Sequence, residues 1–249
     1  MTYNLRLDTQ ADGVNAWPNR KQKVFGLITK TDPDLFGVQE ALHNQINDLK
    51  ASLLQYDFVG VGRDDGKTKG EYSAIFYQKN RFQVIESNTF WLSETPEIPG
   101  SKSWDAAITR VATWAKLYDK KLHDTIFVMN THFDHMGKVA REKSVDIIKS
   151  KINLLAGKLP VIVTGDFNIE PTEAPYAIAT NGEIYNLQDS GKNSAAGTYC
   201  TFSVGAPCKR IDYIFYGAGW RLKKYAVIRQ HDGQYYPSDH LPVVALLKR

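Results

Sequence analysis

Asp166 and Asn168 are two residues whose types and spacing suit catalysis. They follow the apolar residues 159–163 in the stretch LPVIVTGDFN, and Gly165 lets the backbone turn or approach a ligand closely. The unbroken apolar run predicts a strand buried on both faces, whose carboxyl end opens into a loop. In extended backbone the two side chains would point to one side, so a carboxylate and an amide would share a pocket. Taken alone, the segment fits an Asx-type turn better.

Other polar side chains also end or interrupt apolar runs. An unpaired charge at the end of a buried strand is costly, so one shared site would explain them together. Asn4 alternates with Tyr3 and Leu5 and therefore faces the opposite side of its strand. Glu40 lies where a strand meets a helix; locally, a helix residue favoured by the macrodipole fits better than a metal ligand. The complete set is Asn4, Glu40, Glu71, His132, Asp166, Asn168, Asp212, Asp239 and His240.

The elements that must position these residues mix strands with helices. Period-two patterns and short apolar runs predict strands, and apolar residues at helical spacing predict helices. The predicted helices cover residues 17–31, 42–54 and 138–157, with a shorter one after Asn168. The predicted strands cover residues 3–7, 35–38, 58–62, 71–78, 82–93, 108–118, 125–133, 159–163, 210–216, 220–229 and 243–247.

Length and composition favour a single α/β domain over residues 1–249. The chain is 43% hydrophobic, which is enough for a large core, and it shows no clear linker or repeat. A net charge of +4 tolerates a phosphate-bearing substrate but does not indicate a duplex DNA surface, although duplex DNA is not excluded. No apolar run reaches the length of a membrane span.

Cys200 and Cys208 flank a short loop that contains Gly205 and Pro207. They can close a disulfide ring in an oxidising compartment, and two reduced thiols fit the spacing about equally well. The first residues read as the later half of a strand, so an upstream segment can have been removed. We therefore expect, by a small margin, a periplasmic or secreted protein rather than a cytoplasmic one.

Six short blocks carry a resemblance to a known superfamily. In chain order they are MTYNLR, VQE, NTHFD, GDFN, RIDYIF and SDHLP. Together they resemble the endonuclease/exonuclease/phosphatase superfamily of DNase I-like, metal-dependent phosphoesterases, from Asn4 to His240. The segments DGVNAWPNRK, GEYSAIFY and TRVATWAK resemble a bacterial branch of it rather than a named nuclease. The resemblance implies a four-layer α/β/β/α sandwich, DNase I-like in fold.

The resemblance also implies a metal site. Glu40 would be the principal ligand, with Asn4 and Asp239 close by. An all-oxygen set of this kind suits Mg²⁺ or Mn²⁺.

The same resemblance assigns catalytic roles. Asp166 would orient or deprotonate the attacking water, and Asn168 would hold that water or a phosphate oxygen. His240, oriented by Asp212, would act as a base or bind the phosphate, and the sequence leaves open which partner takes the proton. His132 would stabilise or protonate the leaving oxygen.

Two further charged residues have structural alternatives. Glu71 would support His132, but only its strand position favours this role over a solvent-facing one. Arg110, inside an apolar strand, would bind phosphate through two N–H groups, and a structural salt bridge is about as plausible. We interpret His135 as structural or peripheral.

The predicted activity is Mg²⁺- or Mn²⁺-dependent hydrolysis of a phosphodiester in a nucleotide, nucleic acid or lipid head group. In-line attack by water puts negative charge on equatorial oxygens, so a cation and several donors must converge there. Release of phosphate from a sugar or inositol monoester is the alternative, and a non-catalytic binding protein on the same fold is a second one. A zinc hydrolase is disfavoured, because His132 and His135 are too few ligands. Substrate choice should lie in loops 63–70, 94–107 and 181–207.

Overall fold

The computed structural model describes residues 1–181 and 185–249, and its strands form two six-stranded sheets. One set of strands comprises β1 (Thr2–Asn4), β2 (Leu35–Gln39), β3 (Tyr56–Val59), β4 (Ile75–Gln78), β11 (Arg221–Val227) and β12 (Val243–Lys248). The other comprises β5 (Phe82–Trp91), β6 (Val111–Asp119), β7 (Asp124–His132), β8 (Val161–Asp166), β9 (Gln188–Asp189) and β10 (Asp212–Tyr216). The orders are β11-β12-β1-β2-β4-β3 and β5-β6-β7-β8-β10-β9.

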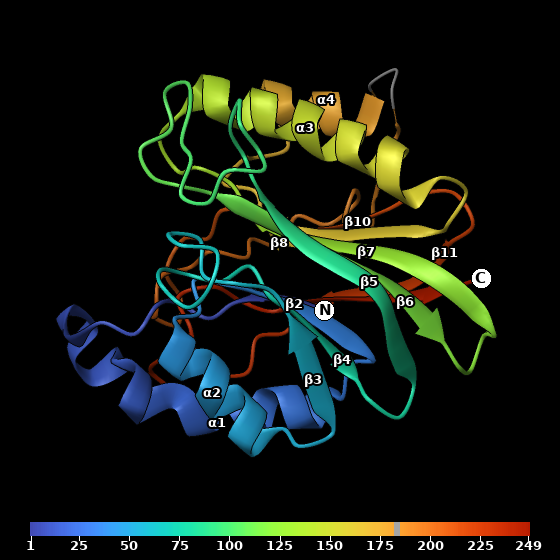
Figure 1. Ribbon diagram of the computed structural model, residues 1–249. Coiled ribbons are helices and arrows are strands. Elements are labelled where there is room, and N and C mark those ends of the chain that lie inside the picture. The colour runs from blue at the N-terminus through green and yellow to red at the C-terminus, as the bar shows by residue number, and fades with distance from the viewer. Residues whose placement is uncertain (182–184) are drawn as a thin grey trace.

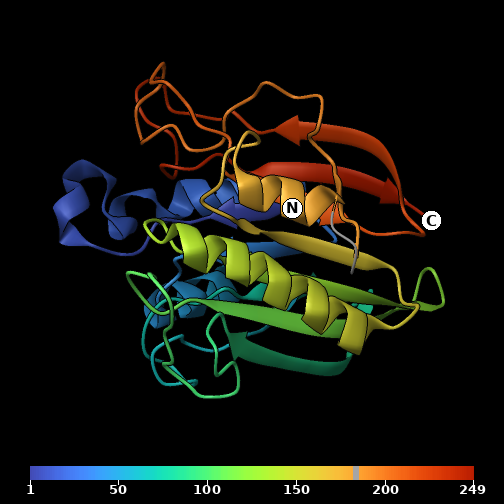
Figure 2. The same ribbon diagram turned by 90° about the horizontal axis from the view of Figure 1, so that it is seen from above.

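Helices cover the outer face of each sheet, which gives four layers (Figure 1). The short 3-10 helix η1 (Gln10–Asn15) leads into α1 (Trp17–Thr31), and α2 (His43–Ser52) lies beside α1 on the first sheet. On the second sheet α3 (Lys138–Ala156) and α4 (Ala174–Asn181) lie side by side, as Figure 2 shows from above. The predicted four-layer α/β/β/α sandwich is therefore confirmed.

The helix ends follow local chemistry. Pro18 occupies the first turn of α1, where its missing N–H costs nothing. The helix is capped at its carboxyl end by Asp32, which adopts a left-handed φ of 43° and is followed by Pro33. Helix α3 ends at Gly157, where a φ of 56° suits a residue without Cβ. Among the described residues, no helix is both long and apolar enough to span a bilayer.

Three apolar clusters hold the layers together. One lies between α1, α2 and the first sheet and includes Val24, Ile46 and Phe36. A second lies between α3, α4 and the second sheet, and a third, which includes Ile75 and Val128, fills the space between the sheets. Because both faces of the inner strands are buried, their sequences read as unbroken apolar runs.

Several predicted strands are shorter than expected, and two of them differ at the ends that face the cavity described below. The strand predicted over 3–7 stops at Asn4, because Arg6 has a left-handed φ of 56° that turns the chain. The strand predicted over 71–78 begins at Ile75, while Tyr72 forms isolated bridges with Ala41 and Gly62. The polar side chains at these positions therefore sit at or just beyond strand ends.

Sheet register gathers the candidate residues from the second sheet. β7 and β8 run parallel and pair His132 with Asp166, and antiparallel β10 pairs Asp212 with the same Asp166. In the first sheet, parallel β1 and β2 pair Asn4 with Gln39, which places Glu40 one residue further along. Parallel strands end at the same sheet edge, so the carboxyl ends of four strands meet there.

A buried asparagine connects the two sheets below this edge. The Asn130 side chain on β7 donates to the carbonyls of Val38 and Ala74 in the first sheet, at 2.8 and 3.0 Å. Its oxygen accepts from Gln39 at 2.6 Å. A Cβ at Gly37 would clash with this amide, so the glycine permits the close approach. The link fixes how the strand ends of one sheet face those of the other.

Candidate active site

A cavity of about 350 Å³ opens where the two sets of strand ends face each other. Eight of the residues predicted from sequence line it: Glu40, Glu71, Arg110, His132, Asp166, Asn168, Asp239 and His240. The other two do not line it but form side-chain hydrogen bonds to residues that do: Asn4 to Asp166, and Asp212 to His240. The fold thus brings together all ten residues, although they are spread over most of the chain.

Asn4 joins two carboxylates at the metal side of the cavity. Its Nδ2 donates to Glu40 Oε1 and to Asp166 Oδ2, each at 3.0 Å. Its Oδ1 accepts from the backbone N–H of Arg6 at 2.9 Å. Asn4 therefore orients the predicted ligand Glu40, and its oxygen is already hydrogen-bonded.

Glu40 sits in a strained backbone conformation with a φ of 60°, the region that favours glycine. Its Oε2 accepts from the backbone N–H of Leu7 at 3.1 Å, and Arg6 Nη1 is 4.0 Å from the same oxygen. Strain of this kind persists when the surroundings hold it, and it often marks a ligand site.

The donor set fits a divalent cation. One ligand atom each from Glu40, His132 and Asp166 lie within 4.8 Å of one another. Burial raises the pKa of Asp239, and the charge of Glu40 adds to this effect against the opposing charge of His240. Carboxylates that repel one another in a buried site are stabilised by a cation, and their oxygens are the ligands that Mg²⁺ and Mn²⁺ prefer.

His240 and Asp212 form a buried pair. His240 Nδ1 is 2.9 Å from Asp212 Oδ2, and the two residues are 4% and 1% exposed. Burial alone would lower the pKa of His240, but the carboxylates of Asp212 and Asp166 outweigh it and raise that pKa well above its usual value. The imidazole therefore carries a positive charge at neutral pH.

Asp166 stands between both histidines. Its Oδ2 is 3.4 Å from His132 Nε2 and 3.7 Å from His240 Nε2, while its Oδ1 accepts from the backbone N–H of Asn168 at 3.0 Å. Burial, helped by the charge of Asp212, raises the pKa of Asp166 to about 7. A carboxylate with a pKa near the working pH is suited to general base catalysis.

His132 has the opposite charge state to His240. Burial and the charges of Arg110 and Arg63 lower the pKa of His132 well below its usual value, so its ring is neutral. Asn168 Nδ2 donates to the carbonyl of Phe133 at 3.0 Å and lies 3.1 Å from His132 Nε2. Since the amide group donates at that contact, the proton of the ring lies on Nδ1. That nitrogen is buried and has no partner among the described residues.

Arg110 is the buried cation of the site. It is 5% exposed, and its Nε and Nη1 have no hydrogen-bond partner within the described chain. Two carboxylates lie near it at a longer range, Asp134 at 3.9 Å and Glu71 at 4.0 Å. The salt bridge weighed as an alternative is thus loose, and two of the guanidinium nitrogens are buried without a hydrogen-bond partner in the described chain.

Glu71 is held by an arginine that the sequence did not single out. Its Oε2 accepts from Arg63 Nη1 at 2.7 Å and is 3.9 Å from His132 Nδ1. Burial raises the pKa of Glu71, against the charge of Arg63. Glu71 therefore lines the cavity and is not solvent-facing, and it contacts His132 only at long range.

The family comparison agrees with this geometry. Residues 1–240 match the model of the Endonuclease/Exonuclease/phosphatase family. The chain belongs to the endonuclease/exonuclease/phosphatase family. Members are hydrolases that act on phosphate esters and generally depend on a divalent metal ion, and the cluster of Glu40, His132 and Asp166 provides a candidate site for one.

Solved structures of this family from Bacteroides align over nearly the whole chain. An endonuclease/exonuclease/phosphatase from Bacteroides vulgatus is 40% identical, with a TM-score of 0.91 and coverage of 99% of this chain and 97% of that one. A mannosyl-6-phosphatase from Bacteroides thetaiotaomicron is 36% identical, with a TM-score of 0.90 and coverage of 100% and 98%. These neighbours make a bacterial origin plausible.

Curated relatives are more distant and mostly longer. The chain is 24% identical to nocturnin of Drosophila melanogaster over 92% of the chain and 41% of that protein. It spans 32% of a matching protein of Acanthamoeba polyphaga mimivirus.

The structure adds residues to this family site that sequence patterns did not reveal. Arg63 lies in a loop that reads as polar and mobile, yet its side chain is 12% exposed and bound to Glu71. His135, interpreted from sequence as structural or peripheral, lines the cavity, and its Nδ1 is 3.2 Å from Arg110 Nη2. Tyr199 also lines it. No local signal marks these residues, because their partners lie far away in the sequence.

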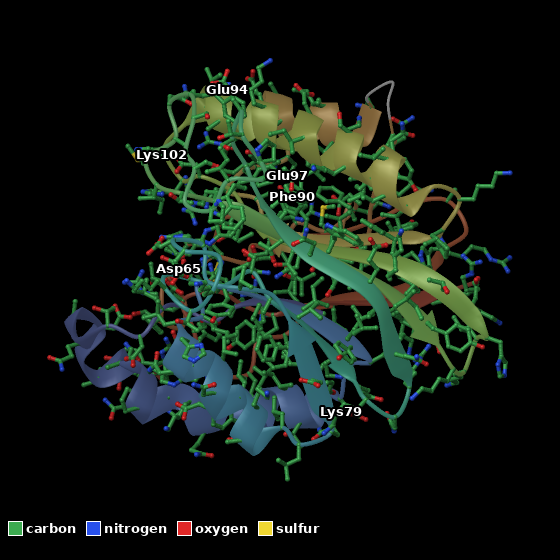
Figure 3. The ribbon with its side chains drawn as sticks, viewed as in Figure 1. Asp65, Lys79, Phe90, Glu94, Glu97 and Lys102 are labelled. Atoms are coloured by element: carbon green, nitrogen blue, oxygen red, sulfur yellow. A yellow bond between two sulfur atoms is a disulfide. The ribbon has the colours of Figure 1, made fainter. Side chains whose placement is uncertain are left out.

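The three loops expected to set specificity differ in position. Among the described residues, loop 181–207 contributes Tyr199 to the cavity lining, whereas loops 63–70 and 94–107 contribute none. Figure 3 shows Glu94 and Lys102 at the upper left beside α3 and Asp65 below them on a separate loop. The 181–207 prediction also includes residues 182–184, which lie outside the described part.

Proposed function

We propose that this protein hydrolyses a phosphate monoester of a sugar or a similar polyol, with Mg²⁺ or Mn²⁺ as cofactor. The observation that carries the proposal is Arg110, a buried guanidinium with two unpartnered nitrogens beside Asp166 and His132. The sequence alone slightly favoured a diester, and the charge of the cavity shifts the preference.

The number of cationic donors favours a doubly charged phosphate. A monoester carries a charge of about −1.5 to −2 at neutral pH, because its second pKa is about 6, and it presents three acceptor oxygens. A diester has one charge and two such oxygens. Arg110, charged His240 and a metal ion held by the cavity carboxylates would offer donors to all three acceptor oxygens of a monoester.

Similarity to a sugar phosphatase supports the same choice. The Bacteroides thetaiotaomicron protein that is 36% identical over the full chain is a mannosyl-6-phosphatase. The cavity volume of about 350 Å³ lies at the small end of the range for small-molecule sites, about 300–1,000 Å³. A hexose phosphate is of a suitable size for it.

The metal ion would be held by Glu40, with Asp239 close by and Asn4 orienting the Glu40 carboxylate. When bound, it supplies Lewis-acid polarisation of a phosphate oxygen.

The residues of the chain supply the water activation. Asp166 accepts a proton from the attacking water at its carboxylate, since burial raises its pKa to about 7. The side-chain amide of Asn4 and the backbone N–H of Asn168 donate to this carboxylate and fix its orientation. Preorganisation of the base removes a reorganisation cost from the barrier.

The remaining groups bind the phosphate. His240, kept charged by Asp212, donates from Nε2 to a phosphate oxygen and is not the base. Arg110 donates through Nε and Nη1. Neutral His132 lines the cavity, and stabilisation of the leaving oxygen is the role expected for it.

Diester cleavage is the second candidate, and the observation that favours it is the 22% identity, over 98% of this chain and 49% of that protein, to the 3'-5'-exoribonuclease subunit Ccr4 of Mycosarcoma maydis. The test compares mannose 6-phosphate, p-nitrophenyl phosphate and bis-p-nitrophenyl phosphate, with Mg²⁺, Mn²⁺ or EDTA. We expect metal-dependent turnover with the highest kcat/KM on the sugar monoester. A higher kcat/KM on the diester would overturn the monoester proposal, and no turnover on any of the three would favour the binding-protein alternative.

A substitution of Arg110 tests the charge argument directly. Arg110→Gln should lower kcat/KM for monoesters by about 10- to 100-fold, the loss expected for a hydrogen bond between charged groups. The diester, with less charge to bind, should lose less. Lys67→Gln, at an exposed position, is the matched control. Equal losses on monoester and diester would contradict the assignment.

We also propose an oxidising, extracytoplasmic location. The support is the disulfide between Cys200 and Cys208, since such bonds persist mainly outside the reducing cytosol. Fractionation of the source cells, with an antibody against the protein, tests this proposal, and recovery with cytosolic markers would contradict it.

A further inference from the structure

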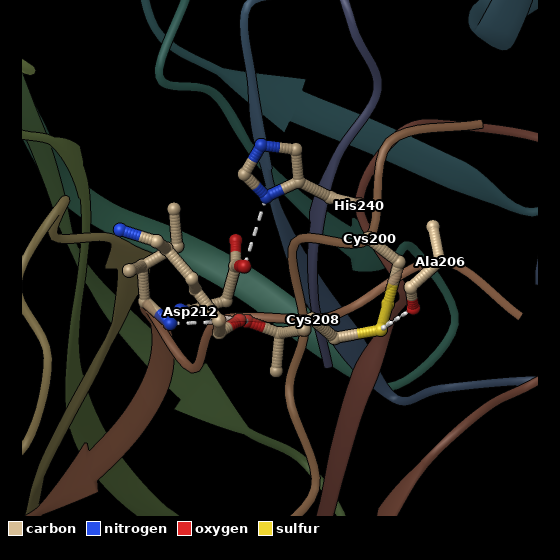
Figure 4. The surroundings of a disulfide bond; sticks show 8 residues. Cys200, Ala206, Cys208, Asp212 and His240 are labelled. Atoms are coloured by element: carbon tan, nitrogen blue, oxygen red, sulfur yellow. Dashed lines mark hydrogen bonds and ion pairs between the residues drawn. A yellow bond between two sulfur atoms is a disulfide. The ribbon is translucent and has the colours of Figure 1, made fainter. Parts of the chain in front are cut away.

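A disulfide closes a small ring next to the catalytic pair. Cys200 and Cys208 are bonded across a separation of 8 residues. Figure 4 shows this bond together with His240 and Asp212. The segments that enter and leave the ring contact catalytic residues.

Thr198, just before the ring, connects two of the catalytic segments. Its Oγ1 accepts from the backbone N–H groups of Ile211 and Asp212, each at 3.1 Å. Its carbonyl accepts from the N–H of Leu241 at 2.6 Å. The residue is fully buried, so the start of β10 and the chain after His240 are both fastened to it.

The next two residues extend the contact. The ring of Tyr199 packs against His240 with centroids 4.9 Å apart. The N–H of Cys200 donates to the carbonyl of Asp239 at 2.9 Å. Asp212, Asp239 and His240 are therefore each contacted by one of three consecutive residues that end at the disulfide.

Backbone hydrogen bonds also hold this ring: the N–H of Tyr236 donates to the carbonyl of Phe202 at 2.8 Å, and the N–H of Val204 donates to that of Gln234 at 3.0 Å. Its apolar cluster consists of Cys200, Tyr236 and Leu241, with three partly buried neighbours. The alternate residues Thr201, Ser203, Gly205 and Pro207 are exposed. Two backbone hydrogen bonds between Tyr199 and Lys209, both 2.9 Å, lie at the base of the ring. The disulfide adds a covalent restraint to these hydrogen bonds, since it removes many alternative chain conformations.

We propose that the Cys200–Cys208 disulfide is a positioning element of the active site. It holds Thr198 and Tyr199 against Asp212 and His240, so that turnover depends on the oxidised ring. This inference rests on the proposed phosphoester hydrolysis for its activity readout. Thr198 is accordingly a positioning residue, because it contacts residues of the cavity but does not line the cavity itself.

The exposure of the two cysteines determines which sulfur atom a reductant attacks. Cys200 is fully buried and Cys208 is partly exposed, so a thiolate from solvent attacks Sγ of Cys208 and displaces the Cys200 thiolate. The second thiol of a dithiol then attacks the mixed disulfide and releases Cys208. Two electrons and two protons pass from the dithiol to the protein, which gains two thiols while the dithiol becomes a cyclic disulfide.

The experiment measures kcat and KM for mannose 6-phosphate and p-nitrophenyl phosphate in the oxidised protein and after reduction with dithiothreitol. Reduction should lower kcat about tenfold, as loss of orienting contacts typically does, with a smaller change in KM. Thr198→Val should cause a similar loss, and Thr198→Ser should restore activity because it keeps the acceptor oxygen. Ser203→Ala, on the exposed side of the ring, is the matched control and should leave kcat unchanged.

The double variant Cys200→Ser/Cys208→Ser should have the lower kcat at the outset and be insensitive to dithiothreitol. If it does not fold, the reduced wild-type protein and the two Thr198 variants still decide the question. An unchanged kcat in the reduced protein would overturn the proposal.

Amide hydrogen exchange gives a readout that does not depend on activity. Reduction should speed exchange at the N–H groups of Ile211, Asp212 and Cys200, while those of β7 stay slow. Slow exchange at all of these positions after reduction would refute the positioning role. If the oxidised protein hydrolyses neither substrate, the proposed function fails, and the exchange result still shows whether the bond holds these segments.

Discussion

Asp134 and Asp166 are two equally buried carboxylates at the same end of the second sheet, and they have opposite electrostatics. Both are 1% exposed. Asp134 lies two residues after His132 in the chain, and Asp166 pairs with His132 across the sheet. Surface exposure therefore does not explain the difference between them, although Asp166 lies deeper in the protein and its charge is penalised more strongly.

The two carboxylates also differ in their hydrogen-bond partners. Asp134 accepts four backbone N–H bonds, from Met136, Gly137, Ala107 and Ile108, at 2.7–3.2 Å. Burial alone would raise the pKa of Asp134, but these donors outweigh it and lower the pKa below its usual value. Asp166 receives one backbone N–H and the amide of Asn4, and burial raises its pKa to about 7.

The contrast separates structural carboxylates from those available to a ligand. Asp134 is satisfied by the protein itself, and it fixes the loop that leads into α3. Asp166, Glu71 and Asp239 all have raised pKa values because the protein does not fully compensate their burial. Groups of this kind cluster at functional sites, where a cation or substrate completes the compensation.

The largest effect should come from Asp166→Asn. Because an amide cannot accept the proton of the water, kcat should fall about 10³-fold. The free energy of unfolding without metal should fall less than in Asp134→Asn, since a buried charge is removed while the new amide NH₂ faces only one donor. Steady-state hydrolysis of mannose 6-phosphate and urea unfolding in EDTA measure the two quantities. A variant that keeps more than about a tenth of wild-type kcat would contradict the base assignment.

Asp134→Asn should show the reverse pattern. An amide NH₂ would face backbone N–H groups, so the free energy of unfolding should fall by about 2–3 kcal/mol. The kcat of the folded protein should change far less than in Asp166→Asn. The same unfolding and turnover measurements apply, and equal stability of this variant and the wild type would remove the distinction between the two carboxylates.

Metal addition should raise the free energy of unfolding through the carboxylates of the site and not through Asp134. At 100 times its Kd, Mg²⁺ should raise the free energy of unfolding by about 2.7 kcal/mol. Glu40→Gln should reduce this gain, while Asp134→Asn, although less stable, should show the full gain. Thermal unfolding with and without Mg²⁺ measures it, and an undiminished gain in Glu40→Gln would argue against that ligand.

The pH dependence of stability should differ in sign between the two carboxylates. In EDTA, folded Asp166 holds a proton between its unfolded pKa of 3.8 and about 7, so stability should fall as the pH rises through that window. The slope for one proton is at most about 1.4 kcal/mol per pH unit. Asp134 contributes stability above its unfolded pKa of 3.8, which is lost as the pH falls through its lowered folded pKa.

Urea unfolding from pH 3 to 8 distinguishes the two contributions. Asp166→Asn should flatten the curve in the neutral window, and Asp134→Asn should flatten only its acidic end. A wild-type curve in EDTA that rises from pH 4 to 7 would show that other groups dominate and would contradict the prediction for Asp166.

Much of the fold could be predicted from the sequence because its cues are local. The helix that begins at Trp17 and ends before Pro33 follows from spacing and caps, and so does the end of α3 at Gly157. The strand predicted over 3–7 ends early, at Asn4, and the strand predicted over 71–78 begins late, at Ile75. The causes are a left-handed backbone and bridges to distant segments, which no local pattern reports.

The sequence by itself determined the family, the four-layer architecture and the residue types gathered at the site. Six blocks in order carried that information, because catalytic side chains recur at the ends of buried strands. Only the tertiary structure decided which of these groups are compensated. The donors that satisfy Asp134 include Ala107 and Ile108, and Arg63 binds Glu71 from a polar loop. Thr198 and Tyr199, next to the disulfide ring, contact Asp212 and His240. Charge state depends on partners brought together by sheet register and loop closure, and this is why identical residue types ended with opposite roles.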